Sequence, residues 1–358
     1  MNNKRFTDIL MLYTDRYEFR FCEENERTRL MEFIHCFWRQ NHVLSQSGAL
    51  LDWQYLDTEK HRYNFILAVE KVTDEIHGIL GFVQTSFFDP EIRTPMRWGT
   101  VWKIRENVAS RGLGLAMKLY MYQSVKAPYM GGIGLSRFSY EINRKMGEEV
   151  GVMEHFYMVN SRFTKFVLAD HVDGSSRPHG FENSKICFEE CQQTDFLNSQ
   201  EEYLAHLLPY KSKIYYVKRF FEHPFYLYHC IKIVGTDKKS TAAFFIRICE
   251  HEDARCIMIV DFLGEEEALA GTGYCFQKLL QEYHAEYISF YEYGLEDKYL
   301  YQAGFKKRKE SRIVLPLYYE PFERVNVDID FHYYNDESVT RKPYFFKGDA
   351  DQDRPNIL

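Results

Sequence analysis

The sequence predicts an α/β (α+β) protein built from two domains that resemble each other. The chain has 358 residues, which corresponds to two domains at about 150 residues each. Apolar residues make up 45% and charged residues 27%, as in ordinary globular proteins. Strand-like and helix-like segments also follow one another in a similar order in both halves. We therefore predict domains at residues 1–170 and 171–341, followed by a docked tail at residues 342–358.

The first half begins with mainly helical sequence and continues with strands. Glu24–Trp38 has apolar residues on one helical face. Strands are predicted at Phe65–Val72, Ile76–Thr85, Trp98–Ile104, Gly131–Ser136 and Val152–Val159, with a helix at Leu115–Val125 and a helix or turn at Phe138–Val150. The order is a hairpin, a strand, a helix and a further strand.

The second half repeats this order loosely after a break at Asp170–Pro178, a segment rich in Gly, Ser and Asp that is typical of a linker. Strands are predicted at Tyr226–Val234, Thr241–Glu250, Cys256–Phe262 and Tyr287–Tyr291, with helices at Gly273–Tyr283 and Lys298–Ala303. The tail carries the aromatic run Tyr344-Phe345-Phe346. Because exposed aromatic clusters are costly, we expect these rings to dock the tail on the body.

Charge and composition exclude several classes of protein. The net charge of −7 argues against a nucleic-acid binder, which normally has a basic surface. No segment approaches the ~18 apolar residues of a membrane-spanning helix, and the start lacks the apolar core of a signal peptide. We therefore expect a cytoplasmic protein without membrane insertion. The eight cysteines form no CxxC pair, so no metal is expected.

The aromatic content of 17% is high and has two interpretations. Tyr and Phe side chains either line a groove for a flat or sugar-like ligand or fill cores rich in β-structure, and we favour the core.

The strongest motif is the run Ala109–Ala116, which lies between a predicted strand and an amphipathic helix. Gly112 and Gly114 allow the backbone to approach a ligand closely. The helix that follows offers unpaired N–H groups and the positive end of its dipole. Together these features predict a pyrophosphate site, although a plain helix start would look similar. The Rossmann motif requires a third glycine where Met117 stands, and the P-loop lysine is absent.

Arg111-Gly112-x-Gly114-x-Ala116 resembles the R/Q-x-x-G-x-G/A signature of the GNAT acyltransferases, in which it binds the pyrophosphate of acetyl-CoA. The resemblance covers residues 1–165 and, more weakly, about 210–310. It implies two domains, each a mixed, mostly antiparallel sheet flanked by helices, and an acyl donor that is acetyl-CoA or another acyl-CoA. The residues that it assigns to the donor are Lys103, Ile104, Arg111, Gly112, Leu113, Gly114, Leu115 and Ala116.

The second copy departs from the signature. Ala270-Gly271-Thr272-Gly273 lacks the Arg and the final small residue, so we expect the second domain to keep the fold without binding CoA. The second domain would then lie on the acceptor side of the active site.

Double-domain GNAT proteins include aminoacyl transferases of peptidoglycan cross-bridges and acyltransferases of surface-polysaccharide gene clusters. Several segments here resemble the latter, among them Leu51–Tyr55, His223–Tyr226 and Phe346–Asn356. The resemblance implies direct transfer of an acyl group, acetyl foremost, to an amine of an amino sugar or sugar nucleotide for surface glycan synthesis. A Fem-like enzyme that uses charged tRNA is an alternative, but no long heptad segment is present. A non-catalytic ligand-binding module is another.

Three residues are candidates for catalysis. Glu106 adjoins the signature and is either a general base or a solvated loop carboxylate. His155, in a predicted strand bordering the cleft between domains, is either a base or a structural histidine. Asp261 ends an apolar strand and either binds the acceptor or caps a turn. In the family a bulged strand before the signature stabilises the oxyanion, which here corresponds to Lys103–Asn107. Asn143 stands where many members of the family have a Tyr that acts as a general acid.

Acceptor-binding candidates come from two parts of the chain. His42 lies near the aromatic residues Trp53 and Tyr55, and the tail supplies Asp349 and Arg354. An Arg side chain suits either a carboxylate or a phosphate, while a purely structural strap is equally consistent with the tail. The oligomeric state is left open.

Overall fold

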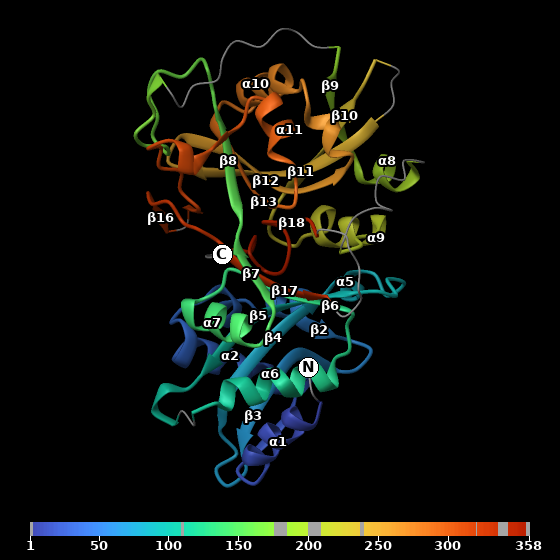
Figure 1. Ribbon diagram of the computed structural model, residues 1–358, viewed down its shortest axis with the longest axis vertical. Helices are drawn as coiled ribbons and strands as arrows, with labels where there is room; N and C mark the ends of the chain where they lie inside the picture. The colour runs from blue at the N-terminus through green and yellow to red at the C-terminus, as the bar shows by residue number, and fades with distance from the viewer. Residues whose placement is uncertain are drawn as a thin grey trace.

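The computed structural model describes residues 3–108, 111–174, 185–199, 209–236, 240–319, 321–335 and 343–355. Two large sheets lie one beyond the other along the long axis of the molecule, and each is flanked by helices (Figure 1). The predicted fold class is confirmed. None of the described helices is long and apolar enough to cross a membrane.

The first sheet is antiparallel except for one parallel pair, β5 with β6. Its order is β1 (Tyr17–Glu23), β3 (Arg62–Glu70), β4 (Ile76–Gln84), β5 (Met96–Ile104), β6 (Tyr129–Ile133), β17 (Asp330–Asn335) and β7 (Glu149–Val152), with β2 (Leu56–Asp57) paired to β3. Its helical segments are α1 (Asn3–Thr14), η1 (Glu24–Glu26), α2 (Arg27–Phe33), η2 (Ile34–Trp38), α3 (Val43–Gln46), α4 (Gly48–Tyr55), α5 (Thr85–Phe88), η3 (Glu106–Val108), α6 (Leu113–Ser124) and α7 (Arg137–Lys145).

The first sheet is buried on both faces at β3, which is apolar on both sides. Ile66 and Ala68 pack with α1 and α6 in one cluster, whereas Phe65 and Leu67 pack with α2 and α4 in another. This alternation follows from the two-residue period of a strand. It also explains why β3 and β4 are continuous apolar runs in the sequence.

The second sheet has the same plan, with one parallel pair, β12 with β13. Its order is β14 (Lys306–Lys307), β8 (Glu154–Val159), β13 (Ala285–Tyr293), β12 (Ala254–Gly264), β11 (Ser240–His251), β10 (Tyr228–Val234) and β9 (Cys187–Cys191), with β18 (Phe345–Phe346) paired to β13. Its helical segments are α8 (Gln193–Asn198), α9 (Lys213–Tyr216), η5 (Val217–Phe221), η6 (Glu266–Leu269), α10 (Gly273–Glu282), α11 (Asp297–Gln302) and η7 (Arg308–Glu310), and a small hairpin joins β15 (Tyr318–Tyr319) to β16 (Phe322–Glu323).

The two sheets exchange strands. Only Met153 separates β7 from β8, so the chain passes directly from the first sheet into the second, as the long green strand in Figure 1 shows. In return, β17 enters the first sheet between β6 and β7. Sheet membership therefore does not follow the predicted division at residues 170 and 341. Of the predicted linker, Asp170 pairs with Val314, and residues 175–178 lie outside the described part of the chain.

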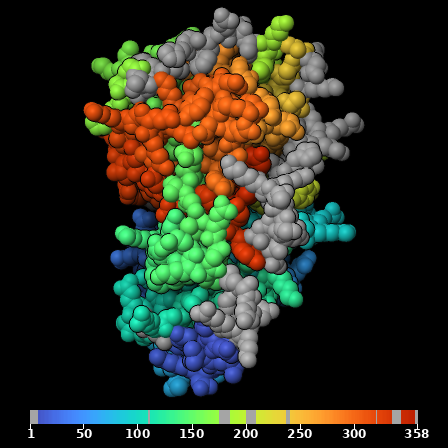
Figure 2. Space-filling view, viewed as in Figure 1, coloured from blue at the N-terminus to red at the C-terminus, as the bar shows by residue number. Residues whose placement is uncertain are grey.

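The tail lies between the two sheets. β12 and β13 pair in parallel as far as Ile259 and Phe290, and beyond that point β18 pairs with Glu292 and Tyr293 of β13. The N–H of Gly348 donates to the carbonyl of Val260 at 2.6 Å. In the space-filling view, tail residues appear in red between the two halves (Figure 2). The tail thus occupies the opening between the two parallel strands of the second sheet.

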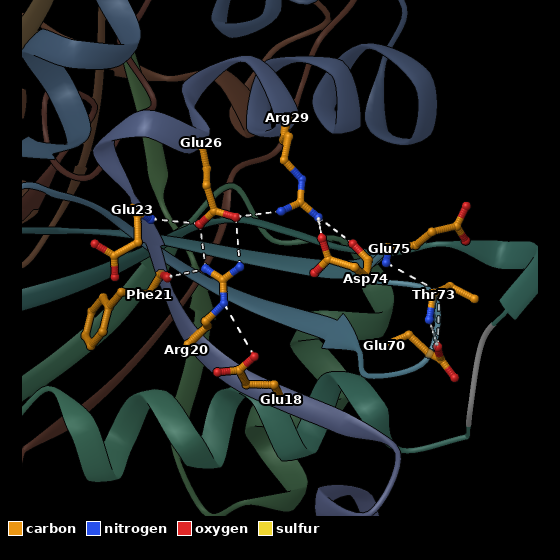
Figure 3. A network of polar contacts seen from close by, with 10 residues as sticks. All are labelled: Glu18, Arg20, Phe21, Glu23, Glu26, Arg29, Glu70, Thr73, Asp74 and Glu75. Atoms are coloured by element: carbon orange, nitrogen blue, oxygen red, sulfur yellow. Dashed lines mark hydrogen bonds and ion pairs between the residues drawn. The ribbon is translucent and has the colours of Figure 1, made fainter.

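A network of polar side chains fixes the start of α2 against the first sheet (Figure 3). Arg20 of β1 binds both carboxylate oxygens of Glu26, one of them at 2.8 Å. Arg29 donates to Glu26 at 2.8 Å and also reaches the turn between β3 and β4 at Asp74. Bidentate pairs of this kind hold a defined geometry. The network orients the helical segment that ends at Trp38.

Candidate functional site

The site is centred where the parallel strands β5 and β6 separate. They pair from Met96 with Tyr129 to Gly99 with Gly132, and beyond Gly99 β5 pairs only with β4. The β4–β5 register shifts there, because Phe82 pairs with Gly99 and Leu80 with Trp102. Two residues, Thr100 and Val101, therefore oppose one residue of β4, which is a β-bulge.

The position of this bulge corrects the sequence-based expectation. We expected it at Lys103–Asn107, but Lys103 and Ile104 pair regularly with Ile79 and Gly78. The bulge instead lies a few residues earlier, beside the separation of the strands. A bulge leaves its extra residue unpaired with the neighbouring strand and is common next to active sites.

The glycine-rich turn forms the start of α6. Gly112 has φ of +93°, the left-handed region that favours glycine, and its carbonyl accepts the first helical hydrogen bond from Ala116 at 3.0 Å. The N–H groups of the first helical turn have no acceptor within the helix. Arg111 is exposed beside them. This arrangement can bind a pyrophosphate.

Both glycines of the turn also lie close to other groups. A Cβ on Gly112 would come within 2.6 Å of the Tyr13 hydroxyl, and one on Gly114 within 3.1 Å of the Trp102 indole. Tyr13 further donates to the carbonyl of Arg111. The residues predicted to bind the acyl donor are thereby brought together along β5 and α6. They are Lys103, Ile104, Arg111, Gly112, Leu113, Gly114, Leu115 and Ala116, whereas Ala109 and Ser110 lie outside the described part.

Glu106 lies on the exposed loop after β5. Its carboxylate is 2.8 Å from Nζ of Lys103, and 87% of its side chain is exposed. The hydrogen bond and charge of Lys103 lower the pKa of Glu106. A carboxylate with a lowered pKa is a weaker base, so the geometry favours the solvated ion pair.

His155 lies in β8, inside the second sheet, whereas the glycine-rich turn follows β5 of the first sheet. Its ring stacks on Tyr291 with centroids 3.9 Å apart, and Nε2 is 2.8 Å from the Ser289 hydroxyl. Burial lowers the pKa of His155 well below its usual value. The strand was expected to border the cleft between the domains, and β8 belongs to the second sheet. Of the two interpretations of His155, a base or a structural histidine, these contacts fit the structural one.

Asp261 and Asp349, predicted from distant parts of the chain, are brought together by Lys211. Nζ of Lys211 lies 2.7 Å from Asp261 and 2.9 Å from Asp349, and all three side chains are buried. Burial, together with the charge of Asp349 and against that of Lys211, raises the pKa of Asp261 to about 7. This cluster ties the tail to the second sheet. Lys211 was missed, since no sequence pattern links it to either aspartate.

A second cluster brings His42, Tyr55 and Arg354 together beside the bulge. Arg354 pairs with Asp351, and its Nη2 lies 3.4 Å from Nε2 of His42. The Tyr55 hydroxyl lies 3.0 Å from Oγ1 of Thr100 and 3.4 Å from Asp351. Tyr55 thus contacts the strand that separates from β6, and Asp351 connects it to Arg354 and His42.

Side chains in this cluster are held in defined protonation states. Burial, aided by the charge of Arg354, lowers the pKa of His42 to about 3, and burial raises the pKa of Tyr55 above its usual value. Both side chains are therefore neutral near pH 7. Thr100 and Asp351 were missed by sequence reasoning. The three aspartates within 349–353 were the available signal for Asp351.

Two further residues have structural positions. Trp53 packs on His223, with ring centroids 4.4 Å apart, and lies under Arg219, so it belongs to the contact between the halves. Asn143 is buried and accepts a hydrogen bond from Lys118, which also pairs with Glu148 at 2.8 Å.

A cavity of about 700 Å³ opens beside the cluster of His42, Tyr55 and Arg354. Its walls come from the end of β6, from β10 and β11, and from the tail. The lining includes Gly134, Leu135, Phe225, Leu227, Arg247, Glu250, Arg255, Tyr318, Asp328, Lys347, Gln352 and Arg354. Nε2 of Gln352 donates to the carbonyl of Ile133 at 2.8 Å. The cavity therefore reaches the other strand of the separated pair, β6.

Comparison with solved structures defines the class of fold. The chain is similar to the Probable N-Acyltransferase of Enterococcus faecalis V583, with a TM-score of 0.53 and 9% identity, covering 88% of this chain and 72% of that one. It is also similar to a GCN5-related N-acetyltransferase from Anabaena variabilis ATCC 29413, with a TM-score of 0.55 and 11% identity over 90% and 73% of the two chains. Searches of family models and of curated proteins find no match. The protein therefore has the tandem GNAT-like fold.

Proposed function

We propose that the protein is an acyl-CoA-dependent N-acyltransferase with one donor site, formed by β5, β6 and the start of α6. The observation that carries this proposal is the separation of the two parallel strands after Gly99, close to the glycine-rich turn, whose Gly114 faces Trp102 of β5. The turn would bind the pyrophosphate through backbone N–H groups and Arg111. The separated strands would accept the rest of the donor between them.

The reaction is direct transfer. The lone pair of an acceptor amine attacks the thioester carbonyl, a C–N bond forms, and the C–S bond breaks to release the thiolate. N–H groups at the Thr100–Val101 bulge would stabilise the oxyanion. The ammonium gives one proton to solvent before attack, and the nitrogen gives a second to the departing thiolate. Asp351 and Tyr55 are the polar side chains positioned to orient the amine. Most of the rate gain would come from positioning.

The proposed acceptor is an amino sugar or a sugar nucleotide, with acetyl-CoA as the donor and surface glycan synthesis as the role. The acceptor would enter through the cavity that reaches the end of β6, whose lining combines charged and aromatic side chains. We place this activity in the cytoplasm. All eight cysteines are free thiols, which fits a reducing compartment.

Two alternatives are distinguished by experiment. A Fem-like transferase would require charged tRNA, which the net charge of −7 does not favour. A non-catalytic module would bind acyl-CoA without turnover.

The test combines calorimetric titration with acetyl-CoA, longer acyl-CoAs and free CoA, and an assay of thiol release with glucosamine and glucosamine 6-phosphate as acceptors. Binding of an acyl-CoA with acceptor-dependent release of thiol is the expected result. Binding without release would favour the module, and absence of binding would overturn the proposal.

A further inference from the structure

The tail segment 347–354 gathers an unusual number of buried charges. Among the described residues, this segment, the side chains that contact it and Asp261, which pairs with Lys211, contain five cations and four carboxylates. The cations are Lys211, Arg219, Arg247, Lys347 and Arg354, and the carboxylates are Asp261, Asp349, Asp351 and Asp353. The cluster therefore has an excess of positive charge even with every carboxylate ionised.

Part of this excess lies at the wall of the cavity. Asp353 is fully buried and accepts hydrogen bonds from Arg247, through Nε at 3.0 Å and Nη2 at 2.8 Å, and from Nζ of Lys347 at 2.6 Å. Although burial alone would raise it, the charges of both cations hold the pKa of Asp353 well below its usual range. Two cations thus share one carboxylate, and both line the cavity.

The other charges around the cavity are matched. Arg255 pairs with Glu250 at 2.5 Å, Asp328 with Arg308, and Arg354 with Asp351. Among the described residues, the excess charge at the wall therefore belongs to Arg247 and Lys347. Two buried cations that share one carboxylate carry an excess charge, which is costly, and an anionic group bound in the cavity would balance it.

We propose that this cavity binds the phosphate of the acceptor at Lys347 and Arg247, so that the acceptor is a phosphorylated amino sugar or a nucleoside diphosphate amino sugar. Its volume of about 700 Å³ falls within the range of about 300–1,000 Å³ that is usual for ligand sites. Phe225 and Tyr318, which are 39% and 36% exposed, line its wall and offer apolar surface to a sugar or base. At the other end, Gly134 and Gln352 bring the amine to β6. The acceptor role rests on the proposed function, but the phosphate site does not.

The experiment is calorimetric titration of the full chain with three probes, glucosamine 6-phosphate, UDP and glucosamine. Either phosphorylated probe should bind at least tenfold more tightly than glucosamine, and the tighter of the two identifies the source of the phosphate. Equal affinity for all three would overturn the proposal.

Lys347→Met is the sharpest variant, because Arg247 still pairs with Asp353 through two hydrogen bonds. It should weaken binding of the phosphorylated probe at least tenfold. The control is Lys307→Met, which likewise removes a lysine that is paired with carboxylates, here Asp297 and Glu154. Lys307 lies outside the cavity lining. Equal losses in the two variants would contradict the proposal.

A second variant does not depend on the buried cluster. Leu227 lines the cavity and is 73% exposed, so Leu227→Trp should leave the melting temperature unchanged and narrow the cavity. Binding of the phosphorylated probe should fall at least threefold, and unchanged binding would count against this cavity. If acyl-CoA does not bind while both variants lose the probe, the donor assignment fails and the phosphate site stands.

Discussion

Single residues of the proposed donor site combine packing with their proposed role in binding. Gly112 and Gly114 leave backbone N–H groups accessible, yet each also faces an aromatic side chain within about 3 Å of an added Cβ. Bulky substitutions there would strain the fold as well as block a ligand, so they cannot isolate the binding role. Arg111 is the better probe because its side chain is exposed.

Arg111→Gln should weaken acyl-CoA binding without loss of stability. A charge-assisted hydrogen bond contributes about 1.5–3 kcal/mol, so the dissociation constant should rise about 10- to 100-fold. Calorimetry gives the affinity and a melting curve the stability. The control is Arg144→Gln. Arg144 is also an exposed arginine, and its guanidinium pairs with Glu141. Unchanged affinity in Arg111→Gln would contradict the donor assignment.

The buried carboxylate of Asp261 should make stability depend on pH. Its pKa is raised to about 7, whereas an unfolded Asp titrates near 3.9. Between these values the folded state binds the additional proton, so stability falls as pH rises from about 4 to 7 and is level above that. Asp261→Asn removes the carboxyl group that binds this additional proton. The difference in unfolding free energy between wild type and variant should therefore change by up to about 1.4 kcal/mol per pH unit in that window.

Urea unfolding at several pH values between 5 and 8 measures this difference. Asp195→Asn, an exposed carboxylate on α8, serves as the control. Parallel pH profiles for wild type and Asp261→Asn would show that Asp261 is ionised throughout.

At the scale of elements, the tail serves both halves. β18 pairs with β13 where β12 and β13 separate, which is the place in the second sheet that corresponds to the proposed donor site in the first. A few residues later, Asp351 and Arg354 reach Tyr55 and His42 beside the bulge in β5. The same segment thus closes one opening and contributes side chains to the other.

Deletion of residues 347–358 should reduce both stability and turnover. Loss of Asp349 and Asp353 leaves Lys211 and Arg247 with fewer counter-charges, and breaking a buried pair costs about 3–5 kcal/mol. At roughly 2–4 °C per kcal/mol, the melting temperature should fall by about 6–20 °C. An unchanged melting temperature would argue that the tail does not stabilise the fold.

Arg354→Gln separates the two effects of the tail. It removes one side chain of the proposed acceptor site and leaves the contacts of Asp349 and Asp353 in place. Turnover should fall at least tenfold with a much smaller change in melting temperature. Loss of stability without loss of turnover would favour a structural strap.

At the scale of the whole molecule, the two halves share a plan but differ at their parallel pairs. In the first sheet, the separation of β5 and β6 lies beside an arginine and two glycines. In the second, Ala270-Gly271-Thr272-Gly273 precedes α10, and the opening is taken by β18 and Gly348.

The chain should therefore bind one acyl-CoA, in the first half. Calorimetry should give a stoichiometry of one per chain, because β18 and Gly348 already satisfy the backbone groups that line the second opening. Arg111→Gln should weaken that single event without revealing another. Two events of similar affinity would show that the tail leaves the second opening readily.

The sequence by itself determined the local features of this protein. Apolar periodicity was enough to predict β3, β4, β5, α6, α10 and β12 nearly to their ends, since these segments are buried on one or both faces. The glycine-rich turn after β5 was visible because glycine at a left-handed position has few substitutes.

Only the tertiary structure decided which distant segments meet. The exchange of β8 and β17 between sheets depends on pairing across more than a hundred residues, for which short strands carry little local signal. The same holds for Lys211 between Asp261 and Asp349, and for Asp351 beside Tyr55. Ion pairs and hydrogen bonds depend on distance in space, and spacing along the chain does not fix that distance for residues brought together by the fold.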